Sequence, residues 1–370
     1  MWVIAEARAM AEKVVVFLSE NTLKAPQFPA HERKRIIEQS TLERGWDNVE
    51  VVIVRGDYTA RVAKNHGIDY LIRGIRNTSD FDYENLIQQT NVDVLHGAKT
   101  MFVMPPRDLG SVSSSFVRAL QGPVGWHWHM KKFVPGPAYY AWIIDWLRKE
   151  WMGLWNYPEL SEPARAHCEH YFALLTQENG YGGPNRHYHN CDHLVHGLTE
   201  IRAWAANTDA SPAAIASLKK AFWFHDAVYH QNDPRISDEE ASAQFWLDAQ
   251  LQQKCGLAED DAVAQLIRVT DHFQESQIDH PLKNVMLGVD LAILGQDDDI
   301  YDIYAKAIRA EYSQVAQAEY RSKRGAAMRH LQQKAESKML FTHPYFADHY
   351  NARAIQNMQR ELHELDGMGE

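Results

Sequence analysis

The sequence predicts a two-part protein, an α/β half followed by an all-helical half. Short β-branched runs alternate with helical periods up to about residue 120, which is typical of βα units with a parallel sheet. From about residue 138 onward, long amphipathic stretches replace those runs. The 370 residues exceed what one hydrophobic core usually serves. We therefore expect one domain over residues 1–137 and a second over residues 138–370.

The first half contains four predicted strands and three predicted helices. The strands are β-branched runs at residues 14–18, 49–54, 70–72 and 100–103. Helical spacing predicts helices over residues 31–44 and 59–66, and Gly67 is expected to stop the second one. Apolar spacing from Trp2 to Met10 predicts a helix at the start of the chain, without a Ser, Thr, Asp or Asn to cap its first turn.

The second half reads as a series of amphipathic helices. Turn-forming Gly122-Pro123 and Pro135-Gly136-Pro137 mark a join near residue 140. Beyond it, the apolar spacing predicts helices over residues 139–154, 162–177, 192–207, 213–229, 238–253, 260–272, 300–319 and 351–365.

The net charge, the apolar runs and the cysteines of the chain disfavour several classes of protein. The 38 Lys and Arg against 49 Asp and Glu give a net charge of −11, which disfavours nucleic acid as a partner. The apolar runs are far shorter than the roughly 20 residues of a membrane span, so no membrane partner is expected. Cys168, Cys191 and Cys255 form no CxxC pair, and the first twenty residues lack the apolar block of a signal peptide. We expect a cytoplasmic protein with reduced thiols.

Two features of the first half suit a phosphate ligand. Arg73 and Arg76 follow a predicted strand, where open α/β sheets bind ligands, and the guanidinium fork matches phosphate. Ser113, Ser114 and Ser115 precede a short predicted helix, whose first N–H groups favour an anion. Taken alone, the serines can simply cap that helix.

Together, residues of the first half resemble the pantetheine-phosphate adenylyltransferases of the nucleotidyltransferase superfamily, over about the first 135 residues. The matching features stand in the family's order: Lys24 with Pro26 and Phe28, residues 49–54, residues 72–76, residues 80–84, Asn91, Met104-Pro105 and residues 113–115. The resemblance implies a Rossmann-like fold and adenylyl transfer from ATP to 4′-phosphopantetheine in coenzyme A biosynthesis, with Mg²⁺. It implies that Lys24 contacts the transferring phosphate and the pantetheine substrate, Arg73 the pantetheine side, and Glu84 with Ser113, Ser114 and Ser115 the ATP.

The first half departs from that family in one respect. The family's first strand, its Gly-Thr-Phe-Asp-Pro loop and its His-x-Gly-His motif have no counterpart, and the second histidine would fall at or before Met1. Either the start of the chain is placed too late, or this half is a catalytically dead domain that binds nucleotide or pantetheine. The uncapped helix at Trp2 favours a misplaced start, because deletion of a central strand would expose a sheet edge.

The second half carries polar side chains within apolar runs, where burial is costly unless those side chains are paired. Taken singly, any of the 19 histidines is more simply a core or surface residue. The residues that stand out as a set are two imidazoles and two carboxylates, those of His193, His225, Asp226 and Asp290. Such a mixed N/O set suits Mn, Fe, Zn, Co or Ni, with Mg at a more carboxylate-rich position.

This pattern resembles the HD-domain superfamily of metal-dependent phosphohydrolases, over about residues 148 to 365. The matching segments are residues 188–193, 224–229, 240–243, 290–295 and 308–312, continued by Arg353 and Asn357. The resemblance implies that His193, His225, Asp226 and Asp290 are the metal ligands. Similarity to cyclic-nucleotide phosphodiesterases implies that His189 is the general acid, and Glu239, Glu240 and His272 are candidates for outer or second-metal groups.

The sequence therefore predicts a bifunctional enzyme, with adenylyl transfer in the first half and metal-dependent hydrolysis of a phosphate ester or nucleotide in the second. Its partners would be small molecules, and the first family's habit of forming hexamers implies a homo-oligomer. One alternative is an HD phosphohydrolase regulated by a catalytically dead nucleotide- or pantetheine-binding domain. Another is that the HD half is a non-catalytic binding module.

Overall fold

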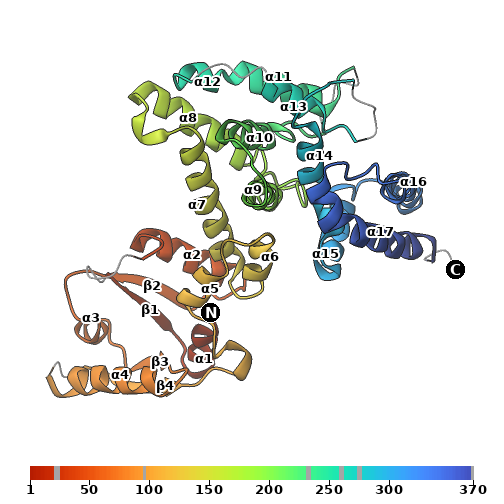
Figure 1. Cartoon of the computed structure of the whole chain (residues 1–370). Helices are drawn as coiled ribbons and strands as arrows, with labels where there is room; N and C mark the ends of the chain where they lie inside the picture. The colour runs from red at the N-terminus through yellow and green to blue at the C-terminus, as the bar shows by residue number, and fades with distance from the viewer. Residues whose placement is uncertain (21–25, 95–96, 231–234, 258–261, 273–276, 368–370) are drawn as a thin grey trace. The chain divides into compact units, whose positions relative to one another are not determined.

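The computed structural model describes residues 1–20, 26–94, 97–230, 235–257, 262–272 and 277–367 (Figure 1). Its contacts divide the chain into two compact units. The first comprises Met1–Gln121 and His129–Trp142, and the second comprises Gly122–Trp128 and Ile143–Glu370. Helix α7 (Gly136–Leu154) contributes residues to both units, so the predicted join near residue 140 falls inside a continuous helix.

The first unit contains two parallel two-stranded sheets. Strand β1 (Val14–Ser19) pairs with β2 (Val49–Val54), and β3 (Tyr70–Gly74) pairs with β4 (Lys99–Val103). Each pair is joined by a crossover that contains a helix, as parallel pairing requires. The four predicted strands are confirmed, with ends that differ by at most two residues. No ladder joins β1 to β3 within the described residues.

Helices precede, connect and follow these strands along the chain. They are α1 (Trp2–Met10), α2 (Ala30–Leu42), α3 (Thr59–Asn65), α4 (Thr78–Gln89), α5 (Ser114–Ala119) and α6 (Trp126–Lys131), with a π-helical turn at Thr90–Val94 and a 3₁₀ turn at Arg107–Leu109. Gly67 has a φ of +66°, so the predicted glycine stop after α3 is confirmed. Helix α1 contacts both β1 and β3. It lies so close that a Cβ on Gly74 would stand 2.8 Å from Cγ2 of Val3.

Within its described residues, the second unit contains helices and turns but no strand, as predicted. After α7 its helices are α8 (Glu162–Thr176), α9 (Cys191–Ala206), α10 (Pro212–Phe224), α11 (Asp238–Ala249), α12 (Leu251–Lys254), α13 (Ala262–Arg268), α14 (Lys283–Leu291), α15 (Asp298–Glu311), α16 (Gln317–Glu336) and α17 (Pro344–Gly367), with 3₁₀ turns at Tyr157–Glu159 and Ala292–Gly295. None of the helices seen in the described parts of the chain has the length and apolar character to cross a membrane.

Several predicted helix ends in this unit are wrong. The helix expected over residues 213–229 stops at Phe224, and the one expected over 238–253 breaks at Gln250, whose φ is +47°. The one expected over 300–319 is α15 followed, after a break, by the separate helix α16. Helix α14 was not predicted. In the first two cases the apolar pattern continues past the helix end, because residues such as Ala227 and Leu251 beyond it are buried too. The residues between α15 and α16 are mostly exposed.

Helix α9 is the central helix of this unit and is buried along most of its length. Its closest neighbour is α10, which it meets at Gly197. A Cβ on Gly197 would stand 2.0 Å from Cζ of Phe222, so only glycine permits this approach. Large indoles fill the surrounding core, among them the fully buried Trp151, Trp155 and Trp223.

Replacement of Gly197 by alanine should therefore destabilise the protein. We expect Gly197→Ala to lower the free energy of unfolding by about 1–3 kcal/mol, the usual penalty of overpacking a core. Urea denaturation followed by circular dichroism measures this change. The matched control is Gly153→Ala, also in a helix but with no atom within 4 Å of the added Cβ. Equal stability of the two variants would contradict the close approach of α9 and α10.

Candidate functional site

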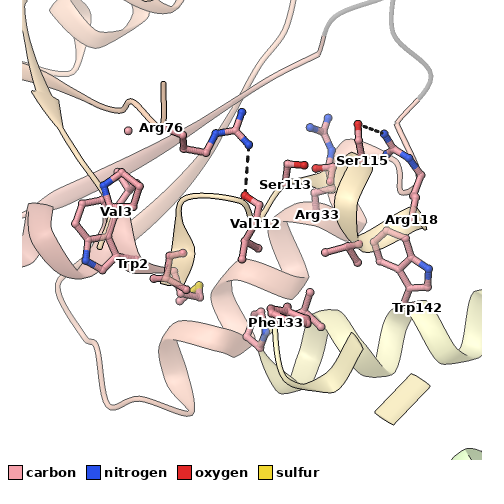
Figure 2. Close-up of a pocket in the computed structure, with 18 of the residues that line it drawn as sticks. Trp2, Val3, Arg33, Arg76, Val112, Ser113, Ser115, Arg118, Phe133 and Trp142 are labelled. Carbon is pink, nitrogen blue, oxygen red and sulfur yellow. Dashed lines mark hydrogen bonds between the residues drawn. The ribbon is translucent and has the colours of Figure 1, made fainter. Parts of the chain in front are cut away.

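A cavity of about 1400 Å³ lies in the first unit at the carboxyl ends of its strands (Figure 2). Ser19 ends β1, Gly74 ends β3 and Pro105 follows β4, and all three line the cavity. This edge is where open α/β sheets bind ligands. The volume exceeds the roughly 300–1,000 Å³ of a typical small-molecule pocket, so there is space for more than one ligand.

The cavity is strongly cationic. Its lining includes the side chains of Arg33, Arg44, Arg76, Arg118 and Lys132. No carboxylate is found among the described residues that line it. An excess of cations in the lining favours a polyanionic ligand.

The serine stretch both caps a helix and lines this cavity. Ser113 is the N-cap of α5, and its Oγ accepts a hydrogen bond of 3.1 Å from the backbone N–H of Phe116. Oγ of Ser115 accepts one of 3.3 Å from Nη2 of Arg118. Ser113, Ser114 and Ser115 all line the cavity. The predicted cap is confirmed, and the predicted role of these serines in binding ATP stays a prediction.

Two arginines of the cavity differ in how they are held. Arg76 is tied in place: its Nε donates to Oδ2 of Asp80 at 2.8 Å, and its Nη1 donates to the carbonyl of Val112 at 3.4 Å. Figure 2 shows the second of these bonds. Arg33, from α2, has a buried Nε without a hydrogen-bond acceptor. A buried donor of this kind costs free energy unless a ligand supplies an acceptor.

Other predicted residues of the first half lie elsewhere. Nε of Arg73 stands 3.4 Å from Oε2 of Glu84, and Arg73 lines a separate cavity of about 690 Å³ along α1, β1 and β3. The structure therefore does not bring Arg73 to the described lining of the serine cavity. Lys24 lies outside the described residues. The roles expected for these three residues remain predictions.

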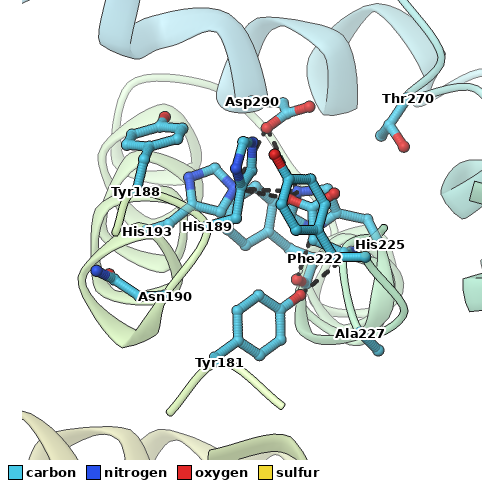
Figure 3. A network of polar contacts seen from close by, with 12 residues as sticks. Tyr181, Tyr188, His189, Asn190, His193, Phe222, His225, Ala227, Thr270 and Asp290 are labelled. Atoms are coloured by element: carbon cyan, nitrogen blue, oxygen red, sulfur yellow. Dashed lines mark hydrogen bonds and ion pairs between the residues drawn. The ribbon is translucent and has the colours of Figure 1, made fainter. Parts of the chain in front are cut away.

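In the second unit, the predicted metal ligands His193, His225 and Asp290 lie together (Figure 3), and Asp226 adjoins them. Nε2 of His193 and Nε2 of His225 are 3.0 Å apart. Oδ2 of Asp226 lies 3.5 Å from the first nitrogen and 3.0 Å from the second. Oδ1 of Asp290 lies 3.4 Å from both. Four side chains from three segments thus present their polar atoms to one point.

These atoms form a buried cluster whose protonation states depend on one another. Nδ1 of His225 lies 2.9 Å from the carbonyl of Phe222, a contact that favours a proton on Nδ1 and leaves the Nε2 lone pair facing the site. Burial alone would lower the pKa of His225, but the carboxylates of Asp226 and Asp290 raise it well above its usual value. The same imidazole holds the pKa of both buried carboxyls below their usual range, against the opposing effect of burial. A proton or a metal ion can supply the balancing positive charge.

A helix cap, a helix end and an arginine position the predicted ligands. The side chain of Asn190 accepts a 2.8 Å hydrogen bond from the N–H of Asp192, so α9 begins here and His193 falls in its first turn, as predicted. His225 and Asp226 lie at and just beyond the end of α10, not inside a helix as expected. Arg186 fixes this segment, since its guanidinium donates to the carbonyl of Asp226 at 2.7 Å.

Glu311, a buried glutamate of the matching segment 308–312 to which the sequence assigned no role, holds His189. The carboxylate of Glu311, at the end of α15, accepts from the backbone N–H groups of Tyr188 and His189 at 2.8 and 2.9 Å. It also contacts Nδ1 of His189 at 2.8 Å and accepts from the hydroxyl of Tyr229 at 3.1 Å. Burial would raise the pKa of Glu311, but these hydrogen bonds, with that from His189 the strongest, lower it to about 2.

The residues expected to be outer or second-metal groups have different surroundings. Nε2 of His272 lies 2.7 Å from Oδ2 of Asp290, so His272 adjoins the ligand cluster. Glu240 is instead engaged by Arg268, whose guanidinium donates to both carboxylate oxygens at 2.6 and 2.9 Å. Glu239 lies beside it on α11. Of these candidates, His272 is the one in direct contact with a predicted ligand.

The fold and the cavity of the first unit define a nucleotidyltransferase-like α/β domain. A family model described as cytidylyltransferase-like matches residues 1–120. A phosphopantetheine adenylyltransferase of Chromobacterium violaceum is 31% identical over 139 residues, which are 38% of this chain and 84% of that protein. A phosphopantetheine adenylyltransferase of Neisseria meningitidis serogroup B is 30% identical over 139 residues, which are 38% of this chain and 81% of that protein. One of Streptococcus suis is 35% identical over 117 residues, which are 32% of this chain and 71% of that protein.

Through its N-terminal part, the chain belongs to the phosphopantetheine adenylyltransferase family.

The contact between Glu311 and His189 can be tested directly. Replacing Glu311 by glutamine removes a negative charge that favours the imidazolium, so we expect the pKa of His189 to fall by about one unit or more. An NMR titration of the His189 C2–H signal measures it. Tyr229→Phe is the control, because it removes one hydroxyl donor and leaves the carboxylate charge. An unchanged pKa in Glu311→Gln would contradict the assignment.

Proposed function

We propose that the first unit binds ATP and 4′-phosphopantetheine and transfers adenylate between them, a step of coenzyme A biosynthesis. The observation that carries this proposal is the cationic cavity at the strand ends, whose described lining contains no acid. Membership of the adenylyltransferase family supports it, because the relatives bear that activity in their names.

Charge neutralisation and positioning are the chemistry that the cavity offers. The guanidinium of Arg76 is fixed by two contacts and so presents a positive charge in one place. Arg33 and Arg118 add charge from other sides of the lining, and an electrostatic cradle of this kind stabilises a phosphoryl centre that gains charge. Since its described lining lacks carboxylates, Mg²⁺ would be held there chiefly by the phosphates of ATP.

A second candidate for this unit is a binding module that regulates the other unit. No histidine is found among the described residues that line the cavity, and histidine is the side chain most often used for proton transfer. An assay of adenylyl transfer from ATP to 4′-phosphopantetheine separates the two candidates. Formation of dephospho-coenzyme A and pyrophosphate supports the enzyme, and binding of both ligands without product supports the module.

Substitutions in this unit should weaken nucleotide binding. We expect Arg33→Ala and Ser114→Ala, both in the lining of the cavity, each to raise the Kd for ATP by about tenfold, the loss of one charge-assisted hydrogen bond. Isothermal titration calorimetry of the full chain measures the change. Arg55→Ala is the control, because Arg55 is exposed, pairs with Glu20 and lines neither cavity. Unchanged affinity in both test variants would count against an ATP site here.

We further propose that the second unit is a metal-dependent phosphohydrolase of the HD type, acting on a phosphate ester or a nucleotide. The supporting observation is the convergence of His193, His225, Asp226 and Asp290. Two imidazoles and two carboxylates fit Mn, Fe, Zn, Co or Ni, and a bound ion would act as a Lewis acid on phosphate and activate water.

The residues around the cluster suit proton transfer to a leaving group. His189 is held by Glu311 through Nδ1, and its ring centroid lies 5.8 Å from that of His193. Burial would lower the pKa of His189, but the negative charges of Asp226 and Glu311 raise it, so the imidazole retains a proton to donate. In the proposed reaction, His189 protonates the leaving oxygen from its Nε2 atom.

Removal of a ligand should abolish metal uptake. We expect His225→Ala and Asp226→Ala, incubated with Mn²⁺ and then desalted, to lose nearly all bound metal by elemental analysis and to lose phosphodiesterase activity on a chromogenic ester. His187→Ala is the control, since His187 is an exposed histidine of the same segment. Full metal content in the ligand variants would refute the site. Bound metal without hydrolysis of any ester tested would favour a non-catalytic module.

A further inference from the structure

Helix α17 packs closely against the chain on both sides of Asp290. Asp290 lies in the last turn of α14, and a 3₁₀ turn follows it. Before Asp290, a Cβ on Gly288 would stand 2.4 Å from Cδ2 of Phe346. After it, a Cβ on Gly295 would stand 2.5 Å from Cβ of Tyr350. Phe346 and Tyr350 are one turn apart on α17, so one face of this helix borders the segment that carries Asp290.

The same helix is hydrogen-bonded to the chain that follows Asp290. Asn357 of α17 is fully buried, and its Nδ2 donates to the carbonyl oxygens of Leu294 and Gln296, each at 2.9 Å. Buried carbonyl groups need hydrogen-bond donors. A single amide group that supplies two of them fixes the course of this segment relative to α17.

A buried carboxylate connects α17 to α9. Glu200 is fully buried and lies roughly two turns after the predicted ligand His193 on α9. The Tyr350 hydroxyl donates to this carboxylate, 2.8 Å from Oε1 and 2.9 Å from Oε2. Nε2 of Gln296 donates to Oε1 at 3.1 Å, and Nε2 of His196 lies 3.2 Å from the same oxygen. Glu200 therefore joins three segments: α9, α17 and the turn after α14.

This arrangement couples the positions of two predicted ligands. A carboxylate in an apolar interior is stable only when donors satisfy it. The donors to Glu200 from outside α9 are Tyr350 and Gln296, which stand on the two other segments. Movement of either segment would leave a buried acceptor without its donor, which costs more than loss of an exposed hydrogen bond. The network therefore opposes any relative movement of the segments that carry His193 and Asp290.

We propose that α17 positions the metal ligands of the second unit. Tyr350 and Asn357 act from α17, and Gln296 completes the connection to Glu200. Together these residues fix the separation between Nε2 of His193 and Oδ1 of Asp290, which is 3.4 Å. That separation determines how tightly and with what geometry the cluster holds a metal ion. The inference rests on the metal site proposed for this unit.

The test measures metal binding by the full chain after the loss of one donor to Glu200. Tyr350→Phe removes the hydroxyl, and Gln296→Met removes the amide with little change in volume. We expect each variant to raise the Kd for Mn²⁺ by about tenfold, the usual effect of losing a residue that supports a metal ligand. The electron paramagnetic resonance signal of free Mn²⁺ measures it. We also expect a changed visible absorption spectrum with Co²⁺ bound, because that spectrum reports coordination geometry.

Tyr301→Phe is the matched control. Tyr301 is also buried, and its hydroxyl also donates to a carboxylate, that of Glu361, which pairs with Arg324. Loss of this bond should lower the melting temperature of the metal-free protein about as much as Tyr350→Phe does. It should leave the Kd for Mn²⁺ and the Co²⁺ spectrum unchanged. A role in stability alone would not separate the two variants in this way.

Several results would overturn the proposal. Unchanged metal binding in both test variants would show that the network only stabilises the fold, and Gln296→Met decides by itself if Tyr350→Phe fails to fold. Equal loss of metal affinity in Tyr301→Phe would show that affinity follows general stability. A wild-type chain that binds neither ion would refute the proposed metal site as well. Normal binding by the wild type with unaffected test variants would refute the positioning role alone.

Discussion

The second unit depends on the burial of two imidazoles and two carboxylates close to one another. Nε2 atoms of His193 and His225 lie 3.0 Å apart, with carboxylate oxygens of Asp226 and Asp290 within 3.5 Å. Such a cluster is stable in an apolar interior only if positive charge balances it. The surrounding caps and the guanidinium of Arg186 hold segments from three helices in the one arrangement that permits this.

In the first unit, the cavity lining carries an excess of positive charge. Its larger cavity gathers cations from α2, from the end of β3 and from α5, and no acid stands among its described lining residues. Mutual repulsion of those cations opposes folding, and an anionic ligand relieves it. The clearest single example is Arg33, whose buried Nε has no hydrogen-bond acceptor. Both units therefore contain charge that a phosphate compound or a metal ion would complement.

Two contacts in the second unit join charged or titratable groups from distant segments. Glu311 contacts Nδ1 of His189, and His272 contacts Asp290, one of the predicted ligands. A charged partner of this kind shifts the pKa of its neighbour. The chemistry of the unit is thus decided by contacts between segments more than by the residue types of any single motif.

The sequence by itself determined the two-part architecture, all four strands and the start of α9, because these depend on periodicity and caps that operate within a few residues. Its motifs also singled out the four residues that converge in the second unit. Only the tertiary structure decided which residues surround them. Glu311 meets His189 across 122 positions of the chain, and the five cations of the first cavity are spread from Arg33 to Lys132. Helix ends such as Phe224 were missed because packing buries turns and helices alike. Local sequence patterns determine local structure. A site is formed by contacts between segments that are distant in sequence, and residue spacing does not predict those contacts.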